Sequence, residues 1–156
     1  MTVEGVITGF LKNGDNYLLM KRADNRRFYP GMWSGIGGHM EESEMNAPER
    51  ACLREIFEET GIAAGSIDGL KLRYIHVAPR DTYIVIHYIF FGDTTESNLI
   101  QTDEGETLWV PEREVPGKDY TPVMRRLVEH YFTYAKDNGT LFLFNESDMS
   151  ITPLME

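Results

Sequence analysis

The sequence predicts a domain of the α/β or α+β class in which a mixed β-sheet lies between helices. Its 156 residues, of which 42% are apolar, suffice for one hydrophobic core. Short runs of apolar and β-branched residues are separated by turn signals, which is typical of strands. Segments with helical spacing both precede and follow some of these runs. We therefore expect a single domain over residues 1–156.

The chain begins with two predicted strands joined by a turn. Apolar and β-branched residues flank the turn-forming sequence Asn13-Gly14-Asp15-Asn16 within residues 3–22. Residues 23–38, ADNRRFYPGMWSGIGG, are rich in glycine, arginine and aromatic side chains, so we expect a loop there.

A helix is predicted next, and its two ends have recognisable signals. Asn46 with Glu49 three residues later predicts a capping box, and Pro48 suits the first turn. Gly61 suits a left-handed C-terminal cap. Leu53, Ile56 and Phe57 are expected to form the apolar face of this helix. We expect Cys52 to be buried as well, as a small hydrophobe.

The second half of the chain predicts more strands and one further helix. Residues 71–78 and 82–91 are strand-like, and the latter, TYIVIHYIFF, is so apolar that we expect a central strand covered on both faces. Residues 108–110 predict a short strand. Helical spacing from Tyr120 to Asp137 predicts a second helix, and residues 140–146 predict a last strand.

Composition excludes several classes of partner. Lys and Arg number 15 against 25 Asp and Glu, so the net charge of −10 disfavours duplex nucleic acid. A small phosphorylated ligand remains compatible if metal ions neutralise it. A lone cysteine and the lack of an apolar run near 20 residues or of a basic N-terminal region favour a cytoplasmic protein without a membrane span. The four histidines lack paired ligand spacing, so we treat them as non-ligands.

The predicted first helix carries three carboxylates on one face. At roughly 100° per residue, Glu55, Glu58 and Glu59 lie together. Such like charges repel by a few tenths of a kcal/mol per exposed pair. Hard divalent cations bind oxygen ligands and would offset this repulsion. A solvated acidic face is the alternative interpretation of the helix taken alone.

The surroundings of the helix carry a family resemblance. Gly37-Gly38 precede it, Arg54 lies among the acids, and Gly61 ends it. The stretch resembles the Nudix box of the Nudix hydrolase superfamily, with matches at Gly38, Glu44, Arg54-Glu55, Ile56, Glu58-Glu59, Gly61 and Ile62. Nine residues, rather than the seven of the signature, separate Glu44 from Arg54. We place the extra pair in residues 45–48, so that either Glu44 or Asn46 occupies the signature position.

The resemblance implies the Nudix fold and a hydrolase that cleaves a nucleoside diphosphate linked to a further group. It implies Mg²⁺, with Mn²⁺ as a substitute, held by Glu55, Glu58, Glu59 and the carbonyl of Gly37 or Gly38. Glu55 is also a candidate base, and Arg54 has an orienting role. The loop TDEGETLW offers Glu104, and next Glu106, as an outlying base or ligand; a solvated acidic loop is the alternative.

A second resemblance concerns the substrate. Residues 33–38, WSGIGG, preceded by MKR, are similar to a stretch of the oxidised-purine nucleoside triphosphatases of the MutT type. Ser34 stands where those enzymes often carry an Asn that reads the base, and DYTPVM lacks the paired aspartates that some of them use. Substrate-binding candidates are the aromatic residues, on which a base could stack, and the arginines, which could steer phosphates: Trp33, Ser34, Phe28, Tyr120, Arg22, Arg26 and Arg27.

Three hypotheses follow from these resemblances. The leading one is a Mg²⁺-dependent pyrophosphohydrolase that cleaves a nucleoside triphosphate, with 8-oxo-dGTP as a candidate, to the monophosphate and pyrophosphate. The second is a hydrolase of ADP-ribose or another conjugate, because Pro79 lies near where such enzymes often carry a proline. The third is a non-catalytic nucleotide-sensing module, which the intact glutamates disfavour. The sequence leaves open whether the chain forms a homodimer.

Overall fold

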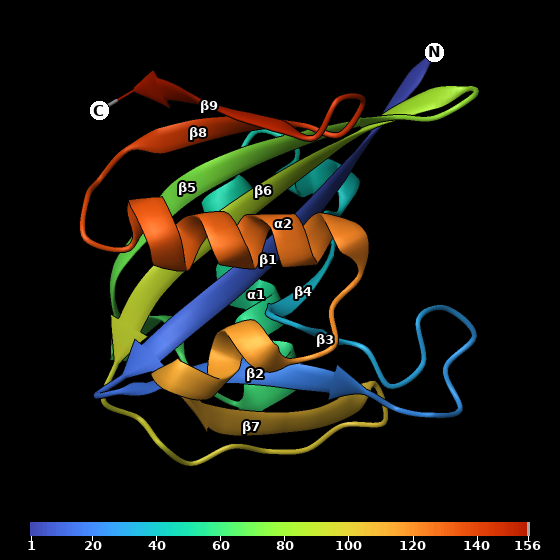
Figure 1. The fold of residues 1–156 in the computed structure, drawn as a ribbon. Coiled ribbons are helices and arrows are strands. Elements are labelled where there is room, and N and C mark those ends of the chain that lie inside the picture. The colour runs from blue at the N-terminus through green and yellow to red at the C-terminus, as the bar shows by residue number, and fades with distance from the viewer. Residues whose placement is uncertain (156) are drawn as a thin grey trace.

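A mixed β-sheet is the centre of the molecule (Figure 1). The computed structural model describes residues 1–155. Within these residues nine strands form one sheet in the order β3-β2-β1-β6-β5-β8-β9, with β4 paired to β1 and β7 to β2. The strands are β1 (Thr2–Asn13), β2 (Asn16–Arg22), β3 (Trp33–Ser34), β4 (Ile36–His39), β5 (Ile67–Pro79), β6 (Tyr83–Thr94), β7 (Gly105–Pro111), β8 (Leu141–Asn145) and β9 (Ser150–Met155). The pairs β1–β6 and β5–β8 are parallel, and the other pairs are antiparallel.

Two helices cover the opposite faces of this sheet (Figure 1). Helix α1 (Pro48–Thr60) lies on one face, and helix α2 (Pro122–His130), which continues as a π-helical turn (Tyr131–Ala135), lies on the other. Short 3₁₀ turns occur at Glu42–Glu44, Ala64–Ser66 and Glu112–Gly117. The predicted fold class, a mixed sheet between helices, is confirmed. Within residues 1–155, no helix combines the length and apolar character needed to cross a bilayer.

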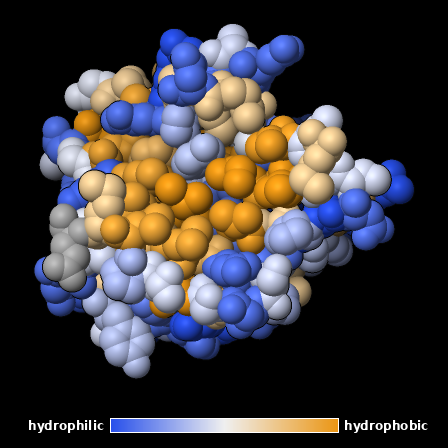
Figure 2. Space-filling model, turned by 90° about the horizontal axis from the view of Figure 1, so that it is seen from above, coloured by the Kyte–Doolittle hydropathy of each residue, from blue (hydrophilic) through white to orange (hydrophobic). Residues whose placement is uncertain are grey.

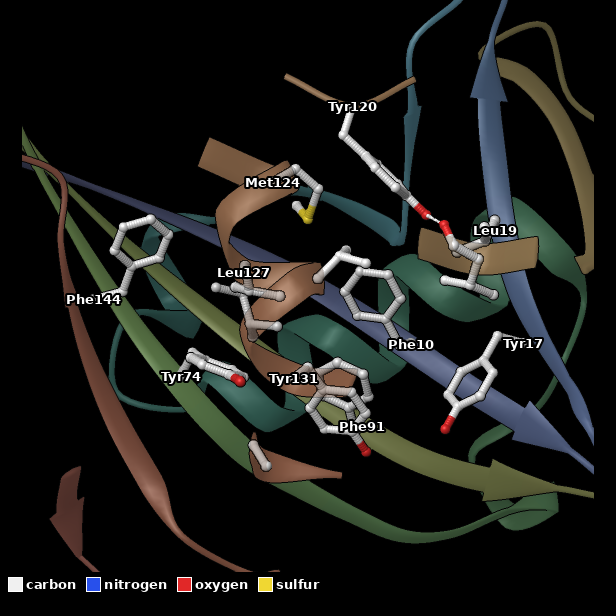
Figure 3. Packing of buried hydrophobic residues seen from close by; sticks show 14 of the residues in the cluster. Phe10, Tyr17, Leu19, Tyr74, Phe91, Tyr120, Met124, Leu127, Tyr131 and Phe144 are labelled. Carbon is white, nitrogen blue, oxygen red and sulfur yellow. Dashed lines mark hydrogen bonds between the residues drawn. The ribbon is translucent and has the colours of Figure 1, made fainter. Parts of the chain in front are cut away.

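Strand β1 supplies both faces of the core because its side chains alternate. Ile7 and Leu11 pack on the α1 side with Ile56, whereas Phe10 packs on the α2 side. On the α2 side, the Tyr131 ring stacks on Phe91 with 3.6 Å between centroids (Figure 3). Phe91 in turn stacks on Phe10 at 4.8 Å. This aromatic contact fixes the C-terminal helix against the sheet.

Part of the sheet has no helix over it. Residues 89–92 of β6 are buried, but residues 83–88 are only half-buried, so the expected cover on both faces is wrong for that half of the strand. The register places Ile84 beside Val3, and Ile86 beside Val77. Val3 is 53% exposed. Figure 2 shows a broad apolar area on the upper side of the molecule, where β8, β9 and the β5–β6 turn lie in Figure 1.

Several predicted elements need correction. The expected loop over residues 23–38 contains β3 and most of β4, and β9 was not predicted. Both strands in the loop are glycine-rich or very short and depend on partners distant in sequence, which a local pattern does not reveal. The second helix begins at Pro122, where the hydroxyl of Thr121 caps it by accepting from the Met124 N–H.

The ends and faces of α1 were predicted in part. Pro48 begins the helix and Gly61 ends it with φ of 81°, as expected. The predicted capping box is wrong, because Ala47 is the N-cap and makes no side-chain cap bond. Phe57 is 55% exposed, so its expected place in the core is wrong. The buried face consists of Ala51, Cys52, Ile56 and Thr60.

Candidate active site

A cleft of about 660 Å³ lies where β1, β2, the loop over residues 23–32, β3, β4 and the two helices meet. It contains acidic groups from α1, backbone from the glycine-rich strand β4, and aromatic and basic side chains from the loop. Of the candidate residues predicted from the sequence, those that line the cleft are Arg22, Arg26, Phe28, Trp33, Ser34, Gly37, Gly38, Glu55, Glu59 and Glu104. The two neighbouring stretches that carry the resemblances, residues 33–38 and 38–62, therefore contribute to one cavity.

Glycine at position 38 allows the backbone of β4 to pack directly on a carboxylate. A Cβ atom built there would lie 2.7 Å from the Glu55 carboxyl carbon, closer than real side chains approach. Burial raises the pKa of Glu55, while the Arg54 contact opposes that rise. Burial also raises the pKa of Glu59, whose Oε2 accepts a hydrogen bond of 2.9 Å from Thr102. Both carboxylates are partly withdrawn from water and gain from a cation.

Arg54 holds the acidic groups together. Its Nε and Nη2 donate to the two oxygens of Glu44 at 2.8 and 2.9 Å, and its Nη1 donates to Glu55 at 2.9 Å and Glu58 at 3.1 Å. The Nη2 group also donates to the carbonyl of His39 at 3.2 Å. These contacts raise the pKa of Arg54, and they hold that of Glu44 below its ordinary value. A guanidinium so placed offsets the repulsion within the cluster.

The two additional residues in the motif do not displace Glu44. Glu44 is buried and binds Arg54 with both oxygens, and its Oε1 also accepts from the N–H of Glu41 at 2.9 Å. Asn46 is exposed in the connection between the 3₁₀ turn and α1. Glu44, and not the alternative Asn46, therefore occupies the place beside the motif arginine. The extra pair lengthens an exposed connection.

Glu58 differs from its two neighbours in direction. Its side chain is 51% exposed, pairs with Arg54, and does not line the cleft. Across residues 1–155, no three His, Cys, Asp or Glu side chains converge as a ready-made metal site. The donors that do face the cleft, Glu55, Glu59 and the glycine backbone, are hard oxygen ligands. This donor chemistry fits a divalent cation of the Mg²⁺ or Mn²⁺ type.

The loop after β6 contributes one of its two candidate glutamates. Glu104 lines the cleft and forms an ion pair of 3.2 Å with Arg26, while its carbonyl accepts from the N–H of Ala23. These contacts join the 23–32 loop to the start of β7. Glu106, the second candidate, lies instead in a neighbouring surface depression. It is not a candidate for the chemistry of this cleft.

The wall opposite the acids is aromatic and basic. Phe28 is 63% exposed at the cleft, and its carbonyl accepts from Arg22 Nε at 2.8 Å. Lys118 Nζ lies 4.7 Å from the centroid of the Trp33 ring. Tyr120 is buried in the core and donates to the carbonyl of Val115, so its expected role in stacking a base is wrong (Figure 3). Pro79 ends β5 and does not line the cleft.

Sequence reasoning missed several residues of the cleft. Thr8 on β1 and His87 on β6 line it, as do Met20, Tyr29, Thr121 and Met124. Thr8 and His87 meet because β1 and β6 pair in parallel, and no short motif encodes that pairing. One signal was present: each is a polar residue within an otherwise apolar strand, GVITGF and IVIHYIFF.

Comparisons with known proteins point to one family. The family model described as the NUDIX domain matches residues 4–131. The nucleoside triphosphatase NudI of Salmonella paratyphi B is 43% identical over 119 residues, covering 70% of this chain and 83% of that protein. NudI of Salmonella typhimurium gives the same values.

Solved structures share the fold at low identity. The MutT protein of Bacillus halodurans superposes with a TM-score of 0.71 at 20% identity, covering 95% of this chain and 94% of that chain. A NUDIX hydrolase from Nitrosomonas europaea gives a TM-score of 0.72 at 18% identity, covering 94% of this chain and 81% of that chain. At these identities the likeness establishes the arrangement of helices and strands.

Proposed function

This chain belongs to the NUDIX domain family and is a hydrolase, and from that premise we propose that it is a pyrophosphohydrolase that uses a divalent cation and cleaves a nucleoside triphosphate. The products are the nucleoside monophosphate and pyrophosphate. We propose Mg²⁺ as the cation, with Mn²⁺ as a substitute, and 8-oxo-dGTP as a candidate substrate. The similarity to NudI, which is a nucleoside triphosphatase, supports this substrate class.

One observation carries the proposal. Glu55 and Glu59 line the same cleft as Trp33 and Ser34. A triphosphate held at the acidic end would extend its base toward the aromatic end. The cavity of about 660 Å³ is within the usual range for small-molecule sites.

The proposed division of roles follows from the contacts. Glu55, Glu59 and the carbonyl of Gly38 would hold the cation from within the cleft, and Glu58 would join them by turning from Arg54 toward it; the cation would supply charge neutralisation for phosphate oxygens and lower the pKa of water. Arg54 keeps Glu55 in place through Nη1. Arg22 and Arg26 lie on the cleft wall, where their charges attract the phosphate chain. Phe28 and Trp33 offer ring faces to the base.

Proton transfer needs an acceptor near the attacking water. We propose Glu104 for this role, with Glu55 as the alternative. Glu104 lines the cleft from the loop preceding β7 and has one ion-pair partner, Arg26. Its carboxylate can take the proton of the water as the water bonds to phosphorus and the pyrophosphate leaves.

A nucleotide panel tests the proposed function. Nucleoside triphosphates, 8-oxo-dGTP and ADP-ribose are incubated with the protein and Mg²⁺, and phosphate and pyrophosphate are measured separately. Pyrophosphate released from a triphosphate supports the proposal, and a preference for 8-oxo-dGTP over dGTP supports the oxidised-purine substrate. Cleavage confined to ADP-ribose contradicts the substrate class. Tight binding without turnover contradicts catalysis and supports a sensing module.

A further inference from the structure

A continuous series of hydrogen bonds runs from the cleft across strands β1, β6 and β5 to Glu146, which follows β8. Thr8 Oγ1 lies 2.7 Å from His87 Nε2, and His87 Nδ1 lies 3.3 Å from His76 Nδ1. His76 Nε2 lies 3.1 Å from Glu146, which follows β8 and accepts from Arg80 at 2.6 Å. Thr8 and His87 line the cleft at one end, whereas Arg80 is exposed at the other.

The chemistry of the outer end sets the direction of every bond in this series. Burial raises the pKa of Glu146, but the contacts with Arg80 and His76 outweigh it, so the net pKa is lowered and the carboxylate is ionised. An ionised carboxylate only accepts, so His76 donates from Nε2. Burial lowers the pKa of His76, which is therefore neutral and has a bare Nδ1.

The same reasoning fixes the inner end. Because His76 Nδ1 is bare, the proton between the two rings belongs to His87 Nδ1. Burial and the neighbouring His76 lower the pKa of His87 to about 3, so its Nε2 carries no proton at neutral pH. Nε2 therefore accepts, and the hydroxyl of Thr8 donates to it. The oxygen of Thr8 has only lone pairs left for a ligand.

The neighbourhood of Thr8 keeps that oxygen available. Thr8 is only 6% exposed, and what is exposed lies at the cleft. A Cβ atom at Gly37, its partner in the β1–β4 pair, would lie 3.0 Å from Thr8 Oγ1, so glycine leaves room beside the hydroxyl on that side. Ser34 resembles Thr8 in that its hydroxyl donates to the carbonyl of Gly35 at 2.8 Å. Thr121 differs, because its oxygen accepts from the Met124 N–H and its hydrogen is uncommitted.

We propose that Thr8 is a specificity-determining residue that accepts a hydrogen bond from an N–H group of the substrate's base, and that His87, His76 and Glu146 are positioning residues that fix its hydroxyl. This inference rests on the proposed function, because it assigns the base to the end of the cleft that holds Trp33 and Ser34. Thr8 lies beside that stretch, since a Cβ atom at Gly35 would be 2.7 Å from Thr8 Cγ2. A base edge that presents an N–H there is favoured. An edge that presents a carbonyl oxygen meets lone pairs and is disfavoured.

The first experiment pairs two variants with two nucleotides. Thr8→Val removes the acceptor at nearly constant volume, and Thr8→Ser retains it as the matched control. The best triphosphate is compared with its analogue in which the relevant base N–H is deleted or methylated. We expect Thr8→Val to lower kcat/KM for the N–H-bearing nucleotide by about tenfold to a hundredfold and to leave the analogue within about threefold. Equal losses on both nucleotides, or a preference unchanged by Thr8→Val, would overturn the proposal.

The second experiment tests the positioning residues by a signal unrelated to turnover. ¹⁵N NMR of histidine in the intact protein at pH 7 should show His87 protonated at Nδ1 and bare at Nε2. In Glu146→Gln, the amide can donate to His76, so we expect the two rings to populate the opposite tautomers and the nucleotide preference to shift toward that of Thr8→Val. A wild-type His87 protonated at Nε2 contradicts the inferred direction. Absence of turnover on every nucleotide contradicts the proposed function instead, since the NMR result stands without it.

Discussion

Arg54 is the residue that allows an acidic site to exist in this fold. One guanidinium bridges the buried Glu44 and the cleft carboxylate Glu55, so the site is held from behind by a charge pair. Pairing of this kind is costly to break on one side, because the remaining charge loses its partner while still partly buried. Arg54 therefore holds the carboxylates of the site in position even before any substrate binds.

Substitution of Glu44 tests this role. We expect Glu44→Gln to lower the free energy of unfolding by about 2 kcal/mol, because it replaces a bidentate charged contact by an uncharged amide. Urea unfolding of the metal-free protein measures the change. Glu41→Gln is the matched control, since Glu41 is 64% exposed and its oxygen is 3.9 Å from Arg54. Equal changes in unfolding free energy for the two substitutions would show that the buried Arg54–Glu44 pair contributes no more to stability than the exposed Glu41.

The carboxylates of α1 are tested by activity. We expect Glu59→Gln and Glu58→Gln each to lower kcat by at least about a hundredfold, because each removes a charged oxygen donor proposed to hold the cation. Glu49→Gln is the control, because Glu49 is exposed in the first turn of the same helix and outside the cleft. Near-normal turnover of Glu58→Gln would remove Glu58 from the proposed ligand set.

His87 gives a prediction for pH. Its pKa in the folded chain is lowered to about 3 from 6.5, so the unfolded chain binds more protons between these values and the free energy of unfolding falls as pH falls. We expect His87→Gln to flatten this dependence by up to about 1.4 kcal/mol per pH unit. Chemical unfolding at a series of pH values from 7 to 4 measures the slope. Parallel curves for the two proteins would contradict the prediction.

At the scale of elements, α1 depends on how it ends. Gly61 has φ of 81°, and a Cβ atom there would lie 3.3 Å from Ile100. We expect Gly61→Ala to cost about 1 to 2 kcal/mol of unfolding free energy, because a side chain is strained in the left-handed region. Gly65→Ala is the control, since an added Cβ at Gly65 meets nothing within 4 Å. Thermal unfolding of both variants separates backbone strain from the mere addition of a methyl group.

The sequence predicted the elements whose signals are local. The hairpin over residues 3–22 and the end of α1 at Gly61 follow from turn and cap residues, and the structure has them. The helix also begins at Pro48 as expected, without the predicted capping box. Sequence reasoning missed β3 and β4, which pair with strands distant in sequence, and β9, a largely exposed strand that contains Pro153 and pairs with the neighbouring β8. Helical periodicity grouped Phe57 with Leu53 and Ile56, but periodicity alone does not show how much of a helix face the rest of the fold covers, and Phe57 is exposed.

For the candidate site too, the sequence predicted the residues that one local stretch positions and missed those that distant pairing brings together. The motif residues Glu55, Glu59 and Gly38 reach the cleft because a single helix and the strand before it position them. Thr8 and His87 were missed, since they meet through the parallel β1–β6 pair and lie 79 positions apart. Tyr120 was misplaced, because an aromatic side chain has the same local pattern whether it fills a core or faces a ligand.

At the scale of the whole molecule, a strong negative charge coexists with an uncovered apolar sheet face. We expect light scattering to show increasing self-association as pH approaches 4.8 or as salt rises, because charge repulsion is then lost or screened. Val3→Glu places a charge on the apolar face and should reduce this association. Thr95→Glu adds the same charge at the opposite end of β6 and is the control. Equal behaviour of both variants would show that the face has no part in the association.

We therefore expect the half of β6 without a helix over it, residues 83–88, to make the dispersion of the protein depend on charge repulsion. Molecules with such an apolar patch stay apart only while their acidic surfaces repel one another. The pH and salt of the buffer should therefore govern solubility as strongly as the stability of the fold does. Substitutions that exchange surface acids for neutral residues would leave folding intact and still shorten the shelf life of a concentrated sample.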